Sequence, residues 1–144
     1  MVIGVKTSDE TYTKTRQFIE KLGKNVVVSR DFPGFIINRI LVMMINEAIF
    51  TVMAGGGTVE TVDGAIKIAA GLPMGPLRVA DLMGLDICLD ILEILYTEFG
   101  DSKYRPAPLL RKYVEAGLLG QKTGKGFYEY APVSEKDKKP IHLV

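Results

Sequence analysis

The chain has 144 residues, of which 47% are hydrophobic, and a formal net charge of only +1. This length suits one domain with a real core, and the near-neutral charge gives no reason to expect a nucleic-acid partner, which usually requires a basic face. Cys88 is the only cysteine, so an intrachain disulfide is excluded and we expect a reducing, cytoplasmic location.

The first 31 residues predict one helix followed by one strand. Thr7 and Glu10 have the spacing of a capping box, and the apolar residues after them recur with a helical period until Gly23. The segment 25–29 is short and rich in valine, which predicts a strand. One strand cannot form a sheet, so we expect its edge to need a partner.

From position 33 onward the sequence predicts helices joined by short turns. A long helix is expected from Pro33 to about position 54, and Asn38, Arg39, Asn46 and Glu47 within it make it too polar to span a membrane. The further expected helices are a second one that Gly71 ends, a short one up to Met83, one over 85–99 and one over 109–116. The charged residues 131–144 predict a disordered tail.

Asn38 is the most informative residue of the long helix. Its neighbours three and four positions away, Phe35, Leu41 and Val42, are all apolar. Burial of an unpartnered amide on such a face would cost about 1–3 kcal/mol. We therefore expect Asn38 to bond to another part of the fold, to a partner or to a ligand.

The residues supply no complete catalytic or metal-binding set. The single histidine, His142, lies in the predicted tail, so a Ser-His-Asp or Cys-His arrangement is not expected in the body. Cys88 lies between apolar residues and is expected to be a small core residue, and the scattered acidic residues predict no metal site. The glycine-rich segments 55–57 and 120–126 fit neither a dinucleotide fingerprint nor a phosphate loop, although Lys122 could attract an anionic cofactor.

Four motifs stand in order along the chain. They are DFPGFIINR at 31–39, NEA at 46–48, PMGP at 73–76 followed by Asp81 and GLD at 84–86, and GQKTGKGFYEY at 120–130. Together they resemble the carboxyl-terminal half of the L-3-hydroxyacyl-CoA dehydrogenases, including the 3-hydroxybutyryl-CoA dehydrogenases. The resemblance covers residues 6–130.

This resemblance implies an all-α fold. Residues 32–130 are expected to form the multi-helix carboxyl-terminal domain through which the family's enzymes form homodimers, and residues 1–31 to be the last helix and strand of a Rossmann domain. The rest of that domain, which in the family holds NAD and supplies the catalytic histidine, is absent from this sequence. The resemblance therefore implies that no catalytic base lies in this chain and that the isolated chain is inactive.

The resemblance also implies the roles of individual residues toward an acyl-CoA substrate. Asn38 is expected to lie beside the substrate's 3-oxygen and to support the missing base. Met74 and Pro76 are expected to line the acyl end of the pocket, and Lys122 to approach the nicotinamide cofactor.

Several alternatives remain open at this level. The chain is either a fragment or a separate subunit that meets a Rossmann partner. It is also compatible with a noncatalytic acyl-CoA-binding or dimerisation module, or with half of a related hydroxyacid dehydrogenase. Asn38 could instead bond within the helical core, and the turn 73–76 could be only a stiff connector. The sequence does not specify the acyl chain length of the substrate or whether the cofactor is NAD or NADP.

Overall fold

The computed structural model describes residues 1–131. Its helical body contains α2 (Ile37–Met53), α3 (Val59–Ala70), α4 (Pro76–Met83), α5 (Leu85–Phe99) and α6 (Pro108–Glu115), with 3₁₀ turns η1 (Ser102–Tyr104) and η2 (Gln121–Thr123). The predicted all-α class is confirmed. His142 and the predicted tail, apart from residue 131, lie outside the described residues, and the predicted domain limits remain predictions.

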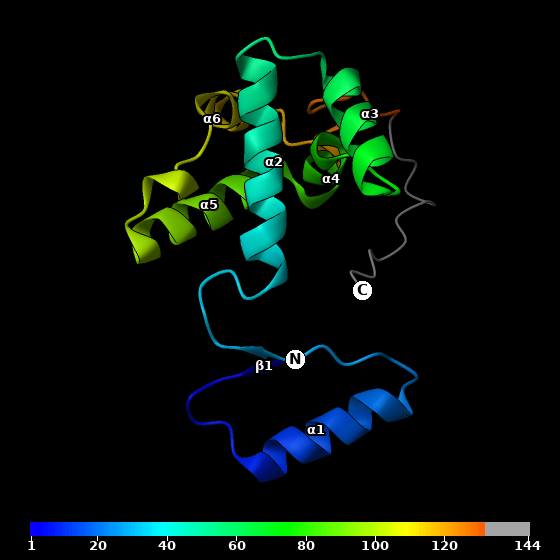
Figure 1. The fold of residues 1–144 in the computed structure, drawn as a ribbon, viewed down its shortest axis with the longest axis vertical. Helices are drawn as coiled ribbons and strands as arrows, with labels where there is room; N and C mark the ends of the chain where they lie inside the picture. Colours follow the sequence, from blue (N-terminus) through cyan, green and yellow to red (C-terminus); the bar gives the residue numbers. More distant parts are fainter. Residues whose placement is uncertain (132–144) are drawn as a thin grey trace.

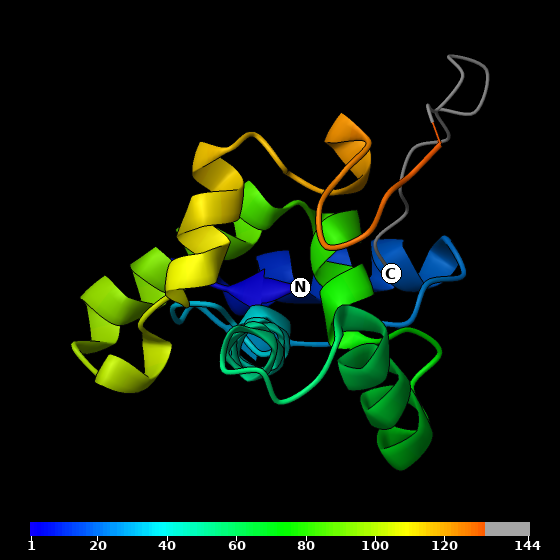
Figure 2. The ribbon, with the colours of Figure 1, turned by 90° about the horizontal axis from the view of Figure 1, so that it is seen from above.

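The long helix α2 is the centre of the body (Figure 1). Val42, Ile45 and Ile49 follow a helical period and are fully buried, because α3 and α4 pack on one side of α2 and α5 and α6 on the other (Figure 2). Leu77 of α4 and Leu92 of α5 complete the same core. Among the described residues, no helix is long and apolar enough to cross a membrane.

The long helix begins at Ile37 and not at Pro33 as predicted. Gly34 has a φ of 75° and Phe35 a φ of 47°, so the chain turns sharply before the helix can start. A Cβ at position 34 would lie 2.9 Å from the Leu95 side chain, which makes glycine necessary at this close approach. The turn therefore determines the direction in which α2 leaves the first 31 residues.

Residues 1–31, called here the amino-terminal unit, contain β1 (Val2–Ile3), α1 (Asp9–Lys21) and β2 (Ser29–Arg30). The predicted strand over 25–29 is wrong except at Ser29, because the chain pairs only where Ser29 and Arg30 lie parallel to Val2 and Ile3. The strand β1 was not predicted, since two residues carry no readable alternation. The predicted cap Thr7 is also wrong: Ser8 caps α1 by accepting a hydrogen bond from the Thr11 N–H at 3.2 Å.

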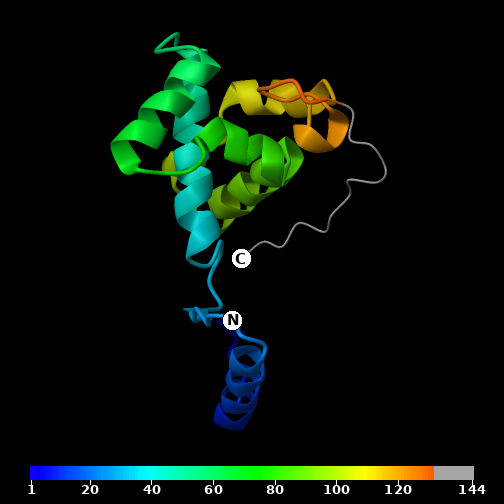
Figure 3. The same cartoon turned by 90° about the vertical axis from the view of Figure 1, so that its right-hand side faces the viewer.

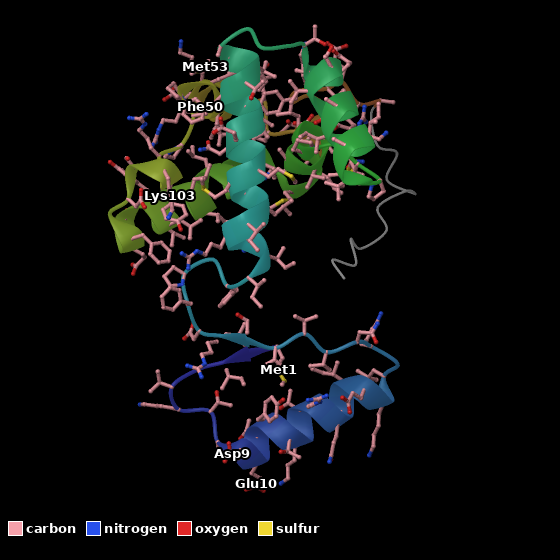
Figure 4. All side chains as sticks on the ribbon, viewed as in Figure 1. Met1, Asp9, Glu10, Phe50, Met53 and Lys103 are labelled. Atoms are coloured by element: carbon pink, nitrogen blue, oxygen red, sulfur yellow. The ribbon has the colours of Figure 1, made fainter. Side chains whose placement is uncertain are left out.

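The amino-terminal unit extends away from the helical body, below the first turn of α2 (Figures 1 and 3). No residue of α1 is buried, and Phe18 and Leu22 are 63% and 60% exposed. Figure 4 shows Met1 in this unit, while Phe50 and Met53 lie at the opposite end of α2. The apolar side of α1 is therefore uncovered in this chain.

Candidate functional site

The first turn of α2 and the two-stranded sheet enclose a hollow of about 230 Å³, called here the neck hollow. The strands contribute one wall and the turn before α2 the other. Its lining residues are Met1, Val2, Val27, Ser29, Phe35, Ile36, Ile37 and Asn38. Asn38 is the lining residue with a side-chain amide, and Ser29 adds a hydroxyl that donates to the Arg30 carbonyl at 3.0 Å.

Asn38 is partly exposed, and its side chain makes no hydrogen bond to any of residues 1–131. The alternative in which its amide bonds within the helical core is not seen among these residues, because the turn at 32–36 leaves the first turn of α2 open. The buried amide of this helix is Asn46, which is 2% exposed. Its Nδ2 donates to the Arg105 carbonyl at 3.0 Å, and its Oδ1 accepts from the Ala107 N–H at 2.9 Å.

The surface beside Asn38 is unusually apolar. Ile37 and Ile40 are 65% and 68% exposed. The guanidinium of Arg39 lies 4.6 Å from the ring centre of Phe99 and 5.9 Å from that of Phe32. These contacts attach the chain before α2 to the end of α5.

Met74 lines a second cavity, of about 300 Å³, between α3 and the start of α4. We call it the Met74 cavity. Its lining residues are Glu60, Asp63, Gly64, Lys67, Pro73, Met74, Gly75, Arg78 and Tyr128. Pro76, in contrast, is fully buried as the first residue of α4. The structure therefore leaves Met74, but not Pro76, with surface for a ligand.

Lys122 lies on η2 beside the first turn of α5. Its ammonium group donates to both carboxylate oxygens of Asp86, at 2.6 and 2.5 Å. A Cβ at Gly84 would lie 2.8 Å from Asp86 Oδ1 and 3.0 Å from Lys122 Nζ, so glycine makes room for the pair. Partial burial alone would raise the pKa of Asp86. The hydrogen bonds from Lys122 outweigh this effect, so the pKa of Asp86 is lowered.

The predicted site residues do not come together in this chain. Asn38 lines the neck hollow, Met74 lines the Met74 cavity, and Lys122 lines neither of them. None of the three reaches a catalytic base among residues 1–131. The three residues therefore lie on separate surfaces of the described part of the chain.

Two buried carboxylates, Asp63 and Asp81, are the polar groups that sequence reasoning missed or left unexplained. Asp63 accepts from the Leu77 N–H at 2.7 Å, the Arg78 N–H at 2.9 Å and the Tyr128 hydroxyl at 2.8 Å, and so caps α4. The signal was available: an aspartate thirteen residues before a proline that opens a helix. Sequence alone did not pair the two segments.

Asp81 fixes the segment 120–130 onto α4. It accepts from the backbone N–H groups of Phe127 and Tyr128, both at 2.9 Å, and from the Tyr130 hydroxyl at 3.1 Å. Burial raises the pKa of Asp81, and burial next to this carboxylate raises the pKa of Tyr130 to about 12. The glycine-rich segment is therefore a packed structural element and not an open phosphate loop.

The predicted role of Cys88 is confirmed. It is fully buried, and burial raises the pKa of its thiol to about 12, which suits a core residue and not a nucleophile. Within residues 1–131 no group of three or more His, Cys, Asp or Glu side chains is placed to hold a metal ion.

Comparison with known proteins assigns the helical body to a family. Residues 34–130 match the model of the 3-hydroxyacyl-CoA dehydrogenase C-terminal domain. The chain belongs to this family. Among similar relatives is the 3-hydroxybutyryl-CoA dehydrogenase of Bradyrhizobium diazoefficiens, 56% identical over 130 residues that make up 90% of this chain and 44% of that protein. A probable 3-hydroxybutyryl-CoA dehydrogenase of Bacillus subtilis is 52% identical over 90% of this chain and 45% of its own length.

Solved structures of the family agree with this assignment. The (S)-3-hydroxybutyryl-CoA dehydrogenase of Ralstonia eutropha superimposes with a TM-score of 0.86 at 45% identity, over 90% of this chain and 46% of that one. This chain therefore spans less than half the length of the relatives it matches.

Proposed function

We propose that this chain forms one wall of the active-site cleft of an NAD-dependent L-3-hydroxyacyl-CoA dehydrogenase with 3-hydroxybutyryl-CoA as the substrate class. The supporting observation is Asn38: an amide at the mouth of an apolar hollow, with no hydrogen-bond partner among residues 1–131. Its role is to hold the substrate's 3-oxygen. The isolated chain is inactive in this proposal.

The carboxamide of Asn38 suits this role because its NH₂ group donates without titrating. In the oxidation of a 3-hydroxyacyl group, the 3-oxygen loses its proton to a base and C3 loses a hydride, which NAD would accept, so the 3-oxygen becomes a carbonyl oxygen. A donor aimed at that oxygen stabilises the negative charge that develops on it. The apolar walls of the neck hollow lower the local dielectric and so strengthen this hydrogen bond.

The proton acceptor must come from outside the described part of the chain. Residues 1–131 contain no histidine, and Cys88 is fully buried in the core with a raised pKa. A general base has to reach the substrate oxygen within about 3 Å. In this proposal it is delivered by a Rossmann half that faces Asn38 across the neck hollow.

The described residues do not form an NAD site of their own. They contain no strand that leads through a glycine-rich turn into a helix, and the ammonium of Lys122 is shared with Asp86. NAD therefore belongs to the complementary half. Lys122 approaches it from the edge of the helical body, and the cytoplasmic location stays a prediction from the sequence.

The amino-terminal unit supports the existence of such a half. A parallel sheet of two two-residue strands leaves open edges, and a helix without buried residues gains little stability from packing. Further strands and helices of a Rossmann domain would cover the open edges of the sheet and the apolar side of α1. Whether that half lies on the same or on a separate polypeptide does not alter this requirement.

A homodimer is also part of the proposal. An apolar groove of about 440 Å³ between α2 and α3 is lined by Met44, Ala48, Val62, Ala65 and Ile66 among others, and Ile68 on α3 is 87% exposed. A second copy of the helical body would remove this apolar surface from water.

The test is to mix the chain with a separately produced NAD-binding half of a 56%-identical relative and to follow acetoacetyl-CoA-dependent NADH oxidation. Restored turnover supports the proposal, and Asn38→Ala should then lower kcat/KM about 10²- to 10³-fold. Thr97→Ala, on the exposed face of α5, is the matched control and should leave kcat/KM unchanged. Full turnover with Asn38→Ala, or no turnover at all, contradicts the proposal.

A further inference from the structure

Phe35, which lines the neck hollow, combines two features that are unfavourable for folding. Its φ of 47° lies in the left-handed region, which a residue with a Cβ adopts only at a cost in free energy. Its aromatic side chain is also 43% exposed, so burial within this chain offsets little of that cost. A glycine would adopt the same backbone conformation more easily. The folding of residues 1–131 therefore does not explain a phenylalanine at this position.

The other phenylalanine of the turn shows how an aromatic side chain can stabilise the fold here. The ring centre of Phe32 lies 5.7 Å from that of Phe99 and 5.9 Å from the guanidinium of Arg39. The ring of Phe35, in contrast, is neither part of the core nor packed against it among residues 1–131. Phe32 therefore contributes to the fold, whereas Phe35 contributes to the neck hollow.

The backbone at Phe35 is held on both sides. The N–H of Phe35 donates to the Phe32 carbonyl at 2.9 Å, and the N–H of Arg39 donates to the Gly34 carbonyl at 3.0 Å. Gly34 itself is packed so closely that a Cβ there would meet its neighbours. The ring of Phe35 is therefore attached to a fixed point, three residues before Asn38.

The neck hollow is small, and most of its lining is apolar. Besides Phe35, its apolar lining residues are Met1, Val2, Val27, Ile36 and Ile37. Such side chains favour methyl and methylene groups over polar ones. The volume of about 230 Å³ is below the roughly 300–1,000 Å³ of typical ligand pockets. The hollow therefore suits a few carbon atoms and not a long chain.

We propose that the neck hollow takes the carbon atoms of the acyl group beyond C3, and that the ring of Phe35 limits their number. This inference rests on the proposed function, in which Asn38 holds the 3-oxygen at the mouth of the same hollow. The Met74 cavity shares no lining residue with the neck hollow, so the acyl end contacts Phe35 and not Met74. Phe35 then makes the enzyme selective for short 3-hydroxyacyl groups.

The experiment compares 3-oxoacyl-CoA substrates with four, six and eight acyl carbons, using the chain mixed with its NAD-binding half and NADH. The kcat/KM of the four-carbon substrate should exceed that of the eight-carbon substrate about tenfold or more, since one methylene in an apolar pocket changes kcat/KM by about tenfold or more. Phe35→Ala should lower this ratio about tenfold or more, because kcat/KM of the eight-carbon substrate rises.

Two further variants separate the ring from the backbone. Phe35→Gly removes the ring and also relieves the left-handed strain, and it should lower the ratio as much as Phe35→Ala does. Phe35→Leu keeps part of the apolar bulk and should keep part of the selectivity. Ile94→Ala, at a residue of α5 that is 55% exposed and lies outside the hollow, is the matched control and should leave the ratio unchanged. A change in only one of Phe35→Ala and Phe35→Gly, or in neither, overturns the inference.

The NAD-binding half is the other surface that could cover Phe35. Calorimetric titration of the chain with that half measures this contact for each variant. If Phe35→Ala weakens the association while the ratio stays unchanged with the half in excess, the ring belongs to the interface between the halves and the inference is overturned. A lowered ratio with the half in excess supports the inference at any strength of association.

The two proposals fail in different ways. Turnover with an unchanged ratio overturns the role of Phe35 while the proposed function stands. Binding of acyl-CoA without turnover contradicts the proposed function, and the ratio of the dissociation constants of the eight-carbon and four-carbon substrates then decides the role of Phe35. A mixture that neither binds acyl-CoA nor turns it over overturns both proposals.

Discussion

At the scale of single residues, two asparagines of α2 have opposite roles. Asn46 is enclosed and bridges Arg105 and Ala107, which are 59 and 61 positions away in sequence. Asn38 lies two turns earlier, partly exposed at the neck hollow. One amide holds the fold together, and the other is left available for a ligand.

This difference predicts opposite effects of the same substitution. Asn46→Ala leaves the buried Ala107 N–H and the part-buried Arg105 carbonyl without this partner, so we expect the free energy of unfolding to fall by about 2–4 kcal/mol. Asn38→Ala should change it by less than about 0.5 kcal/mol. Urea unfolding measures both. Equal losses for the two variants would contradict the assignment.

At the scale of elements, the segment 120–130 depends on close packing against α4 and α5. A Cβ at Gly126 would overlap the Asp81 carboxylate and would lie 2.6 Å from Gly120 Cα. Lys122 adds an ion pair to Asp86 at the start of α5. The motif that resembles a phosphate loop is therefore explained by packing.

Two glycine substitutions test this packing. Gly126→Ala should lower the free energy of unfolding by about 2 kcal/mol or more, because neither neighbour can move aside easily. Gly64 lies within α3, and an alanine Cβ there would have no atom within 4 Å. Gly64→Ala should therefore raise the free energy of unfolding by up to about 1 kcal/mol. Thermal unfolding compares the two, and a neutral Gly126→Ala would count against the packed segment.

The ion pair of Lys122 predicts a pH dependence. Because the pKa of Asp86 is lower in the folded state, its contribution is present above the unfolded value of about 3.9 and is lost as the pH falls through the folded value. Asp86→Asn should cost at most about 1 kcal/mol at pH 7, since both side chains are more than one-third exposed. The loss should vanish in acid, and a pH-independent loss would contradict the pairing.

At the scale of the whole molecule, the body has a core and the amino-terminal unit does not. The core residues of α2, α4, α5 and α6 are fully buried, whereas α1 has no buried residue. We expect the backbone amides of α1 to exchange with solvent rapidly in the isolated chain and to become protected when the NAD-binding half is added. Hydrogen exchange followed by mass spectrometry measures this change. Strong protection of α1 in the isolated chain would show that the unit needs no further cover.

The sequence predicted the helices well because their apolar period and their glycine stops are local. It placed Cys88 in the core and assigned the family from four motifs. It failed where distant segments meet: the pairing of Val2 with Ser29, the capping of α4 by Asp63, and the bridge made by Asn46. Sequence also could not show which side of α2 stays open around Asn38, since the turn at Phe35 determines it.

The most direct test of the central claim is a crystal structure of this chain with its NAD-binding half and acetoacetyl-CoA. The account predicts the 3-oxo oxygen in the neck hollow, about 2.8–3.2 Å from the Asn38 amide nitrogen and opposite the base of the other half. It would be contradicted by an acetoacetyl group bound elsewhere, with the Asn38 amide turned into the protein and bonded there.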